Sequence, residues 1–206
     1  MLYHNKIRMK KKLLRKNTLF TQTTGIYIAM ILLSGVFVFI PTISSDSQDL
    51  WFNSNWIFRK ELTIHHDMVL GNFTNFPVLI SIDSDVDIRD HAQSTGYDFV
   101  FTDVDGNVFN HEIELYDSGT GRLIAWVNVS SLSSLHDTVI YLYYGNDMCG
   151  DQQNISGTWG SDFLMVHHMD GSGNIFDSTS HVLNGVNTGT SAELNGTIDG
   201  ARFFDS

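Results

Sequence analysis

After Trp51 the apolar residues recur at every second position in short blocks, and this alternation restricts the chain to β-structure. The blocks are rich in β-branched and aromatic residues, and turn-forming, glycine-bearing segments separate them. In the last block both faces are apolar, which indicates a central strand covered on each side. The blocks span residues 56–64, 78–82, 97–102, 108–116, 123–129 and 138–144. Short strands at this density, within about 100 residues, predict an all-β, jelly-roll-like β-sandwich.

The first 45 residues carry a different pattern. Seven of the 12 Lys and Arg side chains lie within the first 16 residues, and an apolar run (25–40) follows before Pro41. A helix of that length rises about 24 Å, slightly less than a bilayer core of about 30 Å. The pattern predicts that residues 1–45 are a signal peptide or, if uncleaved, an N-terminal transmembrane anchor helix. Because the cation cluster prefers the cytoplasmic side, the chain from residue 46 onward is expected to be exported to the cell surface.

The exported part is strongly acidic. From residue 46 onward five basic side chains stand against all 23 acidic ones, a formal charge of −18. Nucleic acid and anionic lipid repel such a chain, so the sequence predicts no nucleic-acid partner. The single Cys149 excludes an intramolecular disulfide framework and a cysteine-based zinc site.

A change in composition divides the exported part. Residues 46–146 form the predicted sandwich domain, and the polar, glycine-rich stretch 147–161 is typical of a linker. A strand-like block at 163–169 opens a second unit, residues 162–206. Because 45 residues are too few for an independent sandwich, we expect this unit to be a truncated second β-sandwich module.

Several segments together carry a family resemblance. In order along the chain they read WIFRKELTI, NFPVLISI, YDFVFTDVDGN, EIELYD, LIAWVNVSSLS and IYLYYGN. Over about residues 51–146 the chain resembles the domain-of-unknown-function 2341 family of prokaryotic cell-surface proteins. The following stretch, FLMVHHMDGSGNIFDS, is similar to the opening of a laminin-G or concanavalin-A-like jelly roll. The resemblance implies a β-sandwich at the cell surface and implies no activity.

Two groups of side chains are candidates for weak calcium binding. Asp103, Asp105 and Asn107 surround a glycine, and alternate oxygen ligands around a tight turn can converge on a hard cation. The same residues lie between two predicted strands, where Asp-Gly chemistry makes a hairpin turn. The second candidate, Asp170 with Asp177, follows from the laminin-G resemblance, because such modules often hold calcium at one edge.

Two further patterns bear on catalysis. Glu112 and Glu114 superficially resemble the carboxylate pair of jelly-roll glycoside hydrolases, but a solvent-exposed strand face is the preferred interpretation. The adjacent pairs His65-His66 and His167-His168 should point to opposite faces of strands, which excludes a shared metal. The sequence therefore predicts no catalytic residue.

The Asn-x-Ser/Thr pattern marks four possible glycan acceptors in an exported chain: Asn72, Asn128, Asn154 and Asn195. The four tryptophans and the tyrosines of block 138–144 are expected mainly in the core, with one or two of these aromatic residues free to stack on a sugar. Together these observations favour a non-enzymatic surface binding or adhesion module for a glycan or protein ligand, with membrane contact through residues 25–40 if the signal is uncleaved. The alternatives are a fragment of a carbohydrate-active enzyme and a purely structural envelope spacer.

Overall fold

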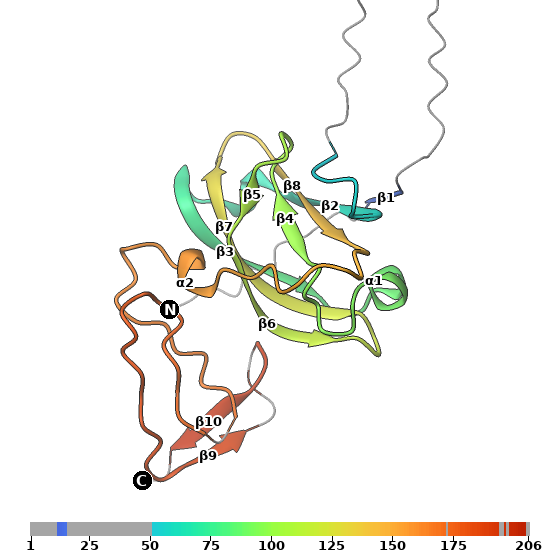
Figure 1. Cartoon of the computed structure of the whole chain (residues 1–206). Coiled ribbons are helices and arrows are strands. Elements are labelled where there is room, and N and C mark those ends of the chain that lie inside the picture. Colours follow the sequence, from blue (N-terminus) through green and yellow to red (C-terminus); the bar gives the residue numbers. More distant parts are fainter. Residues whose placement is uncertain (1–11, 16–50, 172, 194–195, 197, 205–206) are drawn as a thin grey trace, which may run out of the picture.

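The computed structural model describes residues 12–15, 51–171, 173–193, 196 and 198–204 (Figure 1). The predicted apolar helix at residues 25–40 lies outside this part of the chain. Within it, no helix combines the length and the apolar character that crossing a membrane requires. The predicted cationic segment contributes one described strand, β1 (Lys12–Arg15).

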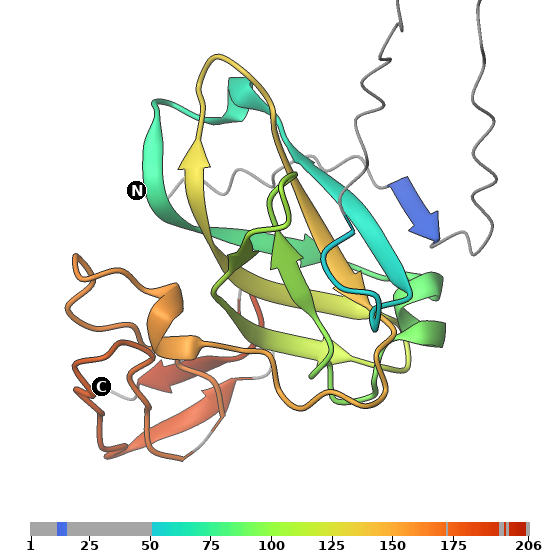
Figure 2. The same ribbon diagram turned by 45° about the horizontal axis from the view of Figure 1, so that its top comes forward.

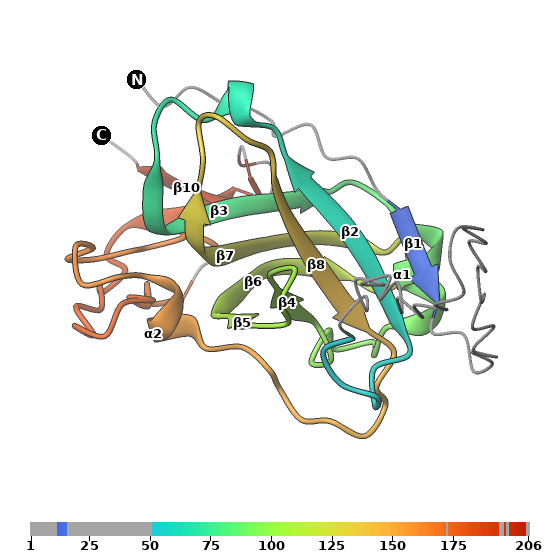
Figure 3. The same ribbon diagram turned by 90° about the horizontal axis from the view of Figure 1, so that it is seen from above.

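The described strands between β1 and residue 144 form two antiparallel sheets. The first has the order β1-β2-β8-β4-β5, and the second has the order β3-β7-β6. Figure 3 shows the strands of the second sheet crossing beneath β2 and β8. The bounds are β2 (Phe58–Ile64), β3 (Phe73–Ile82), β4 (Val100–Thr102), β5 (Val108–Phe109), β6 (His111–Asp117), β7 (Arg122–Leu132) and β8 (Thr138–Tyr144). The predicted all-β sandwich is confirmed.

The main core fills the space between the sheets. Alternate side chains of facing strands meet there, for example Leu62, Ile80, Val127 and Ile140, all of which are fully buried. These contacts explain the period-two pattern of the sequence. A 3-10 turn, η1 (His66–Met68), follows β2, and a short helix, α1 (Val86–His91), follows β3.

A smaller aromatic cluster covers the outer face of the first sheet. It places Trp56 and Tyr143 against Trp51 and Phe52, so that β8 is packed on both sides, as its two apolar faces predict. Arg59 is buried in this cluster, with its guanidinium carbon 4.2 Å from the ring centre of Tyr141. The arrangement is a cation–π contact.

The stretch that composition marks as a linker lies against the sandwich. The backbone N–H of Gln152 donates to the carbonyl of Tyr97, and that of Asn154 donates to the carbonyl of His111. The short helix α2 (Ile155–Thr158) then packs beside β6 and β7.

The C-terminal part contains β9 (Thr190–Glu193) and β10 (Ala201–Phe204), paired in a two-stranded sheet beside the α2 end of the molecule (Figure 2). The strand expected at 163–169 is wrong, since these residues form no strand. The N–H of Val166 instead donates to the side chain of Asp177, 2.9 Å away. The backbone N–H of Val166 is therefore bonded to a side chain and not to the carbonyl of a neighbouring strand.

Candidate functional site

Glu112 and Glu114 of β6 form the centre of a buried polar cluster. The interpretation of this face as solvent-exposed is wrong, because the two side chains are only 8% and 6% exposed. A register shift in the pairing with β7 places a β-bulge between Ile113 and Leu115. Asp117, at the end of the strand, binds the β6–β7 turn through Gly119 and Thr120 and does not join the cluster.

His168 lies between the two carboxylates. Its Nδ1 is 2.8 Å from Oε2 of Glu114, and its Nε2 is 3.2 Å from Oε2 of Glu112. His168 belongs to the adjacent pair His167-His168, which the sequence predicts to be unable to share one metal ion. Its side chain is 17% exposed, so the ion pair is largely shielded from water.

Uncharged donors complete the cluster. The indole of Trp159 donates to Glu112 Oε2 and the indole of Trp126 donates to Glu114 Oε2, both at 2.6 Å. The hydroxyl of Ser178 donates to Glu112 Oε1 at 2.7 Å. None of these three residues was predicted as a partner of Glu112 or Glu114, because they lie on other segments of the chain. The only local signal was two acidic residues with period-two spacing in an otherwise apolar strand.

The electrostatics of the cluster follow from this geometry. Burial alone would lower the pKa of His168, but the carboxylates of Glu112 and Glu114 outweigh that effect and raise the pKa to about 10. Burial would raise the pKa of Glu112, yet the ion pair with His168 and the hydrogen bonds from Ser178 and Trp159 lower it overall. At neutral pH the cluster therefore contains an imidazolium and an ionised Glu112.

This arrangement is poorly suited to glycoside hydrolysis. A retaining glycosidase needs one carboxyl that gives up a proton and a second that reaches the sugar. Here Glu112 is held ionised, and both carboxylates accept hydrogen bonds from fixed indoles. The cluster instead joins β6 to the later segments that carry Trp159, His168 and Ser178.

A second buried carboxylate, Asp98, joins two of the segments that carry the family resemblance. Its Oδ2 accepts from the N–H groups of Gly145 (2.7 Å) and Asn146 (3.2 Å), and its Oδ1 accepts from Gln93. Burial raises the pKa of Asp98, and these backbone hydrogen bonds act against that shift. Asp98 therefore ties the segment YDF to the segment YYGN.

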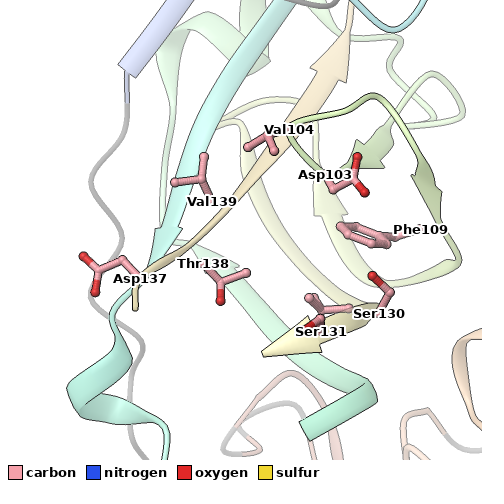
Figure 4. Close-up of a pocket in the computed structure, with 9 residues that line it drawn as sticks. Asp103, Val104, Phe109, Ser130, Ser131, Asp137, Thr138 and Val139 are labelled. Atoms are coloured by element: carbon pink, nitrogen blue, oxygen red, sulfur yellow. The ribbon is translucent and has the colours of Figure 1, made fainter. Parts of the chain in front are cut away.

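A shallow depression of about 330 Å³ opens at the end of the sandwich where β7 stops and β8 begins (Figure 4). Figure 4 shows Phe109 and Asp103 on one side of the depression, across from Val139 and Thr138. The remaining lining residues are Val104, Val129, Ser130, Ser131 and Asp137. None of the described residues after 144 lines it.

The loop predicted to bind calcium forms the hairpin turn between β4 and β5. Asp103 Oδ1 accepts from the N–H groups of Asp105 (2.9 Å) and Asn107 (2.8 Å), and its Oδ2 accepts from the Asn107 amide. Gly106 has φ +84°, as the turn requires. The calcium site stays a prediction.

Asp170 and Asp177, the second calcium candidate, have different roles in the structure. The Asp177 carboxylate organises its own loop, accepting from the N–H groups of Val166, Thr179 and Leu183. Desolvation would raise its pKa, but these hydrogen bonds lower it. Asp170 receives a hydrogen bond from Arg202 on its backbone carbonyl. Among the described residues, no group of three or more His, Cys, Asp and Glu is placed to hold a metal ion.

His65 and His66 do not point to opposite faces, contrary to the expectation. Their Nδ1 atoms lie 3.1 Å and 2.7 Å from the two oxygens of one carboxylate, that of Asp137. The strand ends at Ile64 and His66 begins η1, so the alternation of a strand no longer applies. A hydrogen bond from the His66 N–H is the main reason that the pKa of Asp137 falls to about 2.

The predicted glycan acceptors differ in exposure. Asn72 is exposed, although its Oδ1 accepts from Ser134. Asn154 is exposed and caps α2 by accepting from the N–H of Gly157. Asn128 is half-buried, with its amide donating to the carbonyl of Thr158. Asn195 lies outside the described residues.

Comparison with known families gives one match. Residues 95–184 match the family model described as Domain of unknown function (DUF2341). This match supports the family part of the resemblance. It includes Glu112 and Glu114, and because it continues past residue 146 it also includes His168 and Ser178. No family match supports the laminin-G or concanavalin-A-like resemblance. No curated protein and no solved structure matches the chain.

Proposed function

We propose that the chain is an exported, non-catalytic binding module of the cell surface, and that the depression at the end of its sandwich holds a neutral sugar unit of a surface glycan. The depression lined by Phe109 and three hydroxyl side chains is the observation that carries this proposal. Export is supported by the cation cluster and the apolar run at 25–40. The C-terminal residues are proposed to open a concanavalin-A-like module, on the strength of the sequence resemblance.

The lining suits a polyol better than other ligands. The apolar atoms of Val104 and Val139 can lie against the C–H groups of a sugar, while Ser130, Ser131 and Thr138 offer hydroxyls to its hydroxyl groups. A volume of about 330 Å³ is at the small end of ligand sites, which favours a single sugar ring. The acidity of the exported part disfavours anionic ligands.

The test is a glycan array probed with the full chain and with two variants. Ser131→Tyr places a large side chain in the depression, whereas Ser191→Tyr makes the same change at an exposed serine of β9. We expect binding to neutral glycans by the wild type and Ser191→Tyr, and its loss in Ser131→Tyr. Binding that survives Ser131→Tyr would place the ligand elsewhere, and no binding at all would favour the structural spacer. Release of reducing ends from a polysaccharide would favour the enzyme alternative.

A further inference from the structure

We infer that Glu112, His168 and Glu114 form a buried clamp that fixes residues 152–179 to the sandwich as part of one folding unit, so that the chain beyond them leaves the sandwich at a fixed orientation. The clamp, defined as these three residues, differs from the proposed sugar depression in place and in purpose. A glycine-rich stretch of this composition would otherwise be a flexible connection.

The first argument is that the clamp joins distant segments. Its carboxylates come from β6, and its imidazole comes from a segment without regular structure more than 50 residues later. Trp159 and Ser178, which hydrogen bond to Glu112, lie 47 and 66 residues from it. Three side chains from three places in the chain therefore meet at the two carboxylates.

The second argument concerns charge. The charged groups that meet His168 are Glu112 and Glu114. The ring of the uncharged Trp159 lies 5.9 Å from its ring, and the uncharged Trp126 and Ser178 hydrogen bond to the same two carboxylates. Removing the imidazolium leaves two neighbouring carboxylates in a shielded site without a cation. Loss of one partner from a buried ion cluster is strongly destabilising for this reason.

The third argument is that further contacts hold the same segment along its length. The amides of Asn110 and Asn128 donate to the carbonyls of Gly157 and Thr158. Immediately after His168, Met169 adopts φ +61°, a left-handed conformation that is uncommon for a residue with a side chain. Such a conformation persists where surrounding contacts determine it, which is expected beside a clamp.

The clamp has a defined response to pH. His168 holds its proton up to about pH 10 in the folded chain, whereas an unfolded histidine loses it near 6.5. A raised pKa means that the stabilising contribution is complete below about 6.5 and is lost as the pH rises toward about 10. Docking of residues 152–179 should therefore weaken under alkaline conditions.

Hydrogen exchange of the full chain tests the clamp. We compare the wild type with His168→Gln, using His181→Gln as the matched control because His181 is exposed. At neutral pH we expect the His168→Gln substitution to lower the amide protection factors at 152–179 about tenfold. This factor corresponds to about 1.4 kcal/mol in the opening free energy. Protection in the β3–β7 pair should fall less, and His181→Gln should match the wild type. Unchanged protection at 152–179 in His168→Gln would overturn the inference.

The wild type alone decides the matter if His168→Gln does not fold. Protection factors at 152–179 should fall from neutral pH to about pH 10 by more than those of the β3–β7 pair, because only the former segment depends on the His168 proton. Equal changes in both places would refute the clamp. Either result is independent of whether the depression binds a sugar.

Discussion

Asp98 connects two segments of sequence that lie far apart in the chain. Its Oδ2 accepts from the N–H of Gly145, 47 residues away, so YDF and YYGN are the two halves of one buried hydrogen-bonded contact. A buried carboxylate without a cation is costly, and three backbone donors offset part of that cost. Two of these donors, the N–H groups of Gly145 and Asn146, point at Asp98 where the chain turns sharply at Gly145, which has φ +84°.

Gly145→Ala is therefore expected to destabilise the fold by about 2 kcal/mol or more. A Cβ at this position would lie 2.6 Å from the ring of Phe58 and would occupy a left-handed conformation. Gly150→Ala is the matched control, since a Cβ there meets nothing within 4 Å. It should leave the free energy of unfolding within about 0.5 kcal/mol of the wild type. Urea unfolding of the full chain measures the free energy of unfolding of both variants. If Gly145→Ala loses no more stability than Gly150→Ala, the turn at Gly145 does not require glycine.

At the scale of elements, the sequence predicted what depends on alternation and missed what depends on distant contacts. β8 was correctly expected to be central, because both of its faces are apolar and each is packed. β3 begins at Phe73, earlier than expected, because its first four residues are exposed and carry no alternation. Glu112 and Glu114 have the spacing of a solvent face, and only the tertiary structure reveals that a later histidine covers them. A local pattern cannot report such a partner.

The β4–β5 hairpin gives a prediction at the same scale. Asp103→Ala removes three hydrogen bonds that shape the turn and should lower the free energy of unfolding by about 1 kcal/mol. Asp105→Ala should have little effect without calcium, because the exposed Asp105 takes part through its backbone N–H.

Calcium separates the two interpretations of this loop. If the loop binds the ion with an extracellular affinity of about 10⁻⁴–10⁻³ M, calcium at about 10–50 mM should raise the unfolding midpoint of the wild type relative to EDTA. The double variant Asp103→Ala, Asp105→Ala should not respond. An identical response of wild type and double variant to calcium would reduce the loop to a turn.

At the scale of the whole molecule, the proposed depression and the clamp lie on different parts of one sandwich. The proposed depression opens beside the β7–β8 connection, and no described residue beyond 144 covers it. Strand β6 of the second sheet carries the two carboxylates of the clamp, and α2 packs beside β6 and β7. A binding site and a fixed continuation of the chain on the same sandwich would suit a surface protein, because the bound ligand and the following residues keep a constant relative position.

Shortening the chain tests this division. A chain ending at residue 148 lacks Trp159, His168 and Ser178, so Glu112 and Glu114 lose their cation and two donors. It should be less stable than the full chain by about 3 kcal/mol or more. A chain ending at residue 184 keeps these groups and should lose less, since it gives up mainly β9, β10 and the contacts of Arg202. Urea unfolding followed by tryptophan fluorescence and circular dichroism should show one coincident transition for the 184-residue chain. If the 148-residue chain is as stable as the 184-residue chain, the sandwich is an independent domain and residues 147–161 act as the linker that their composition predicts.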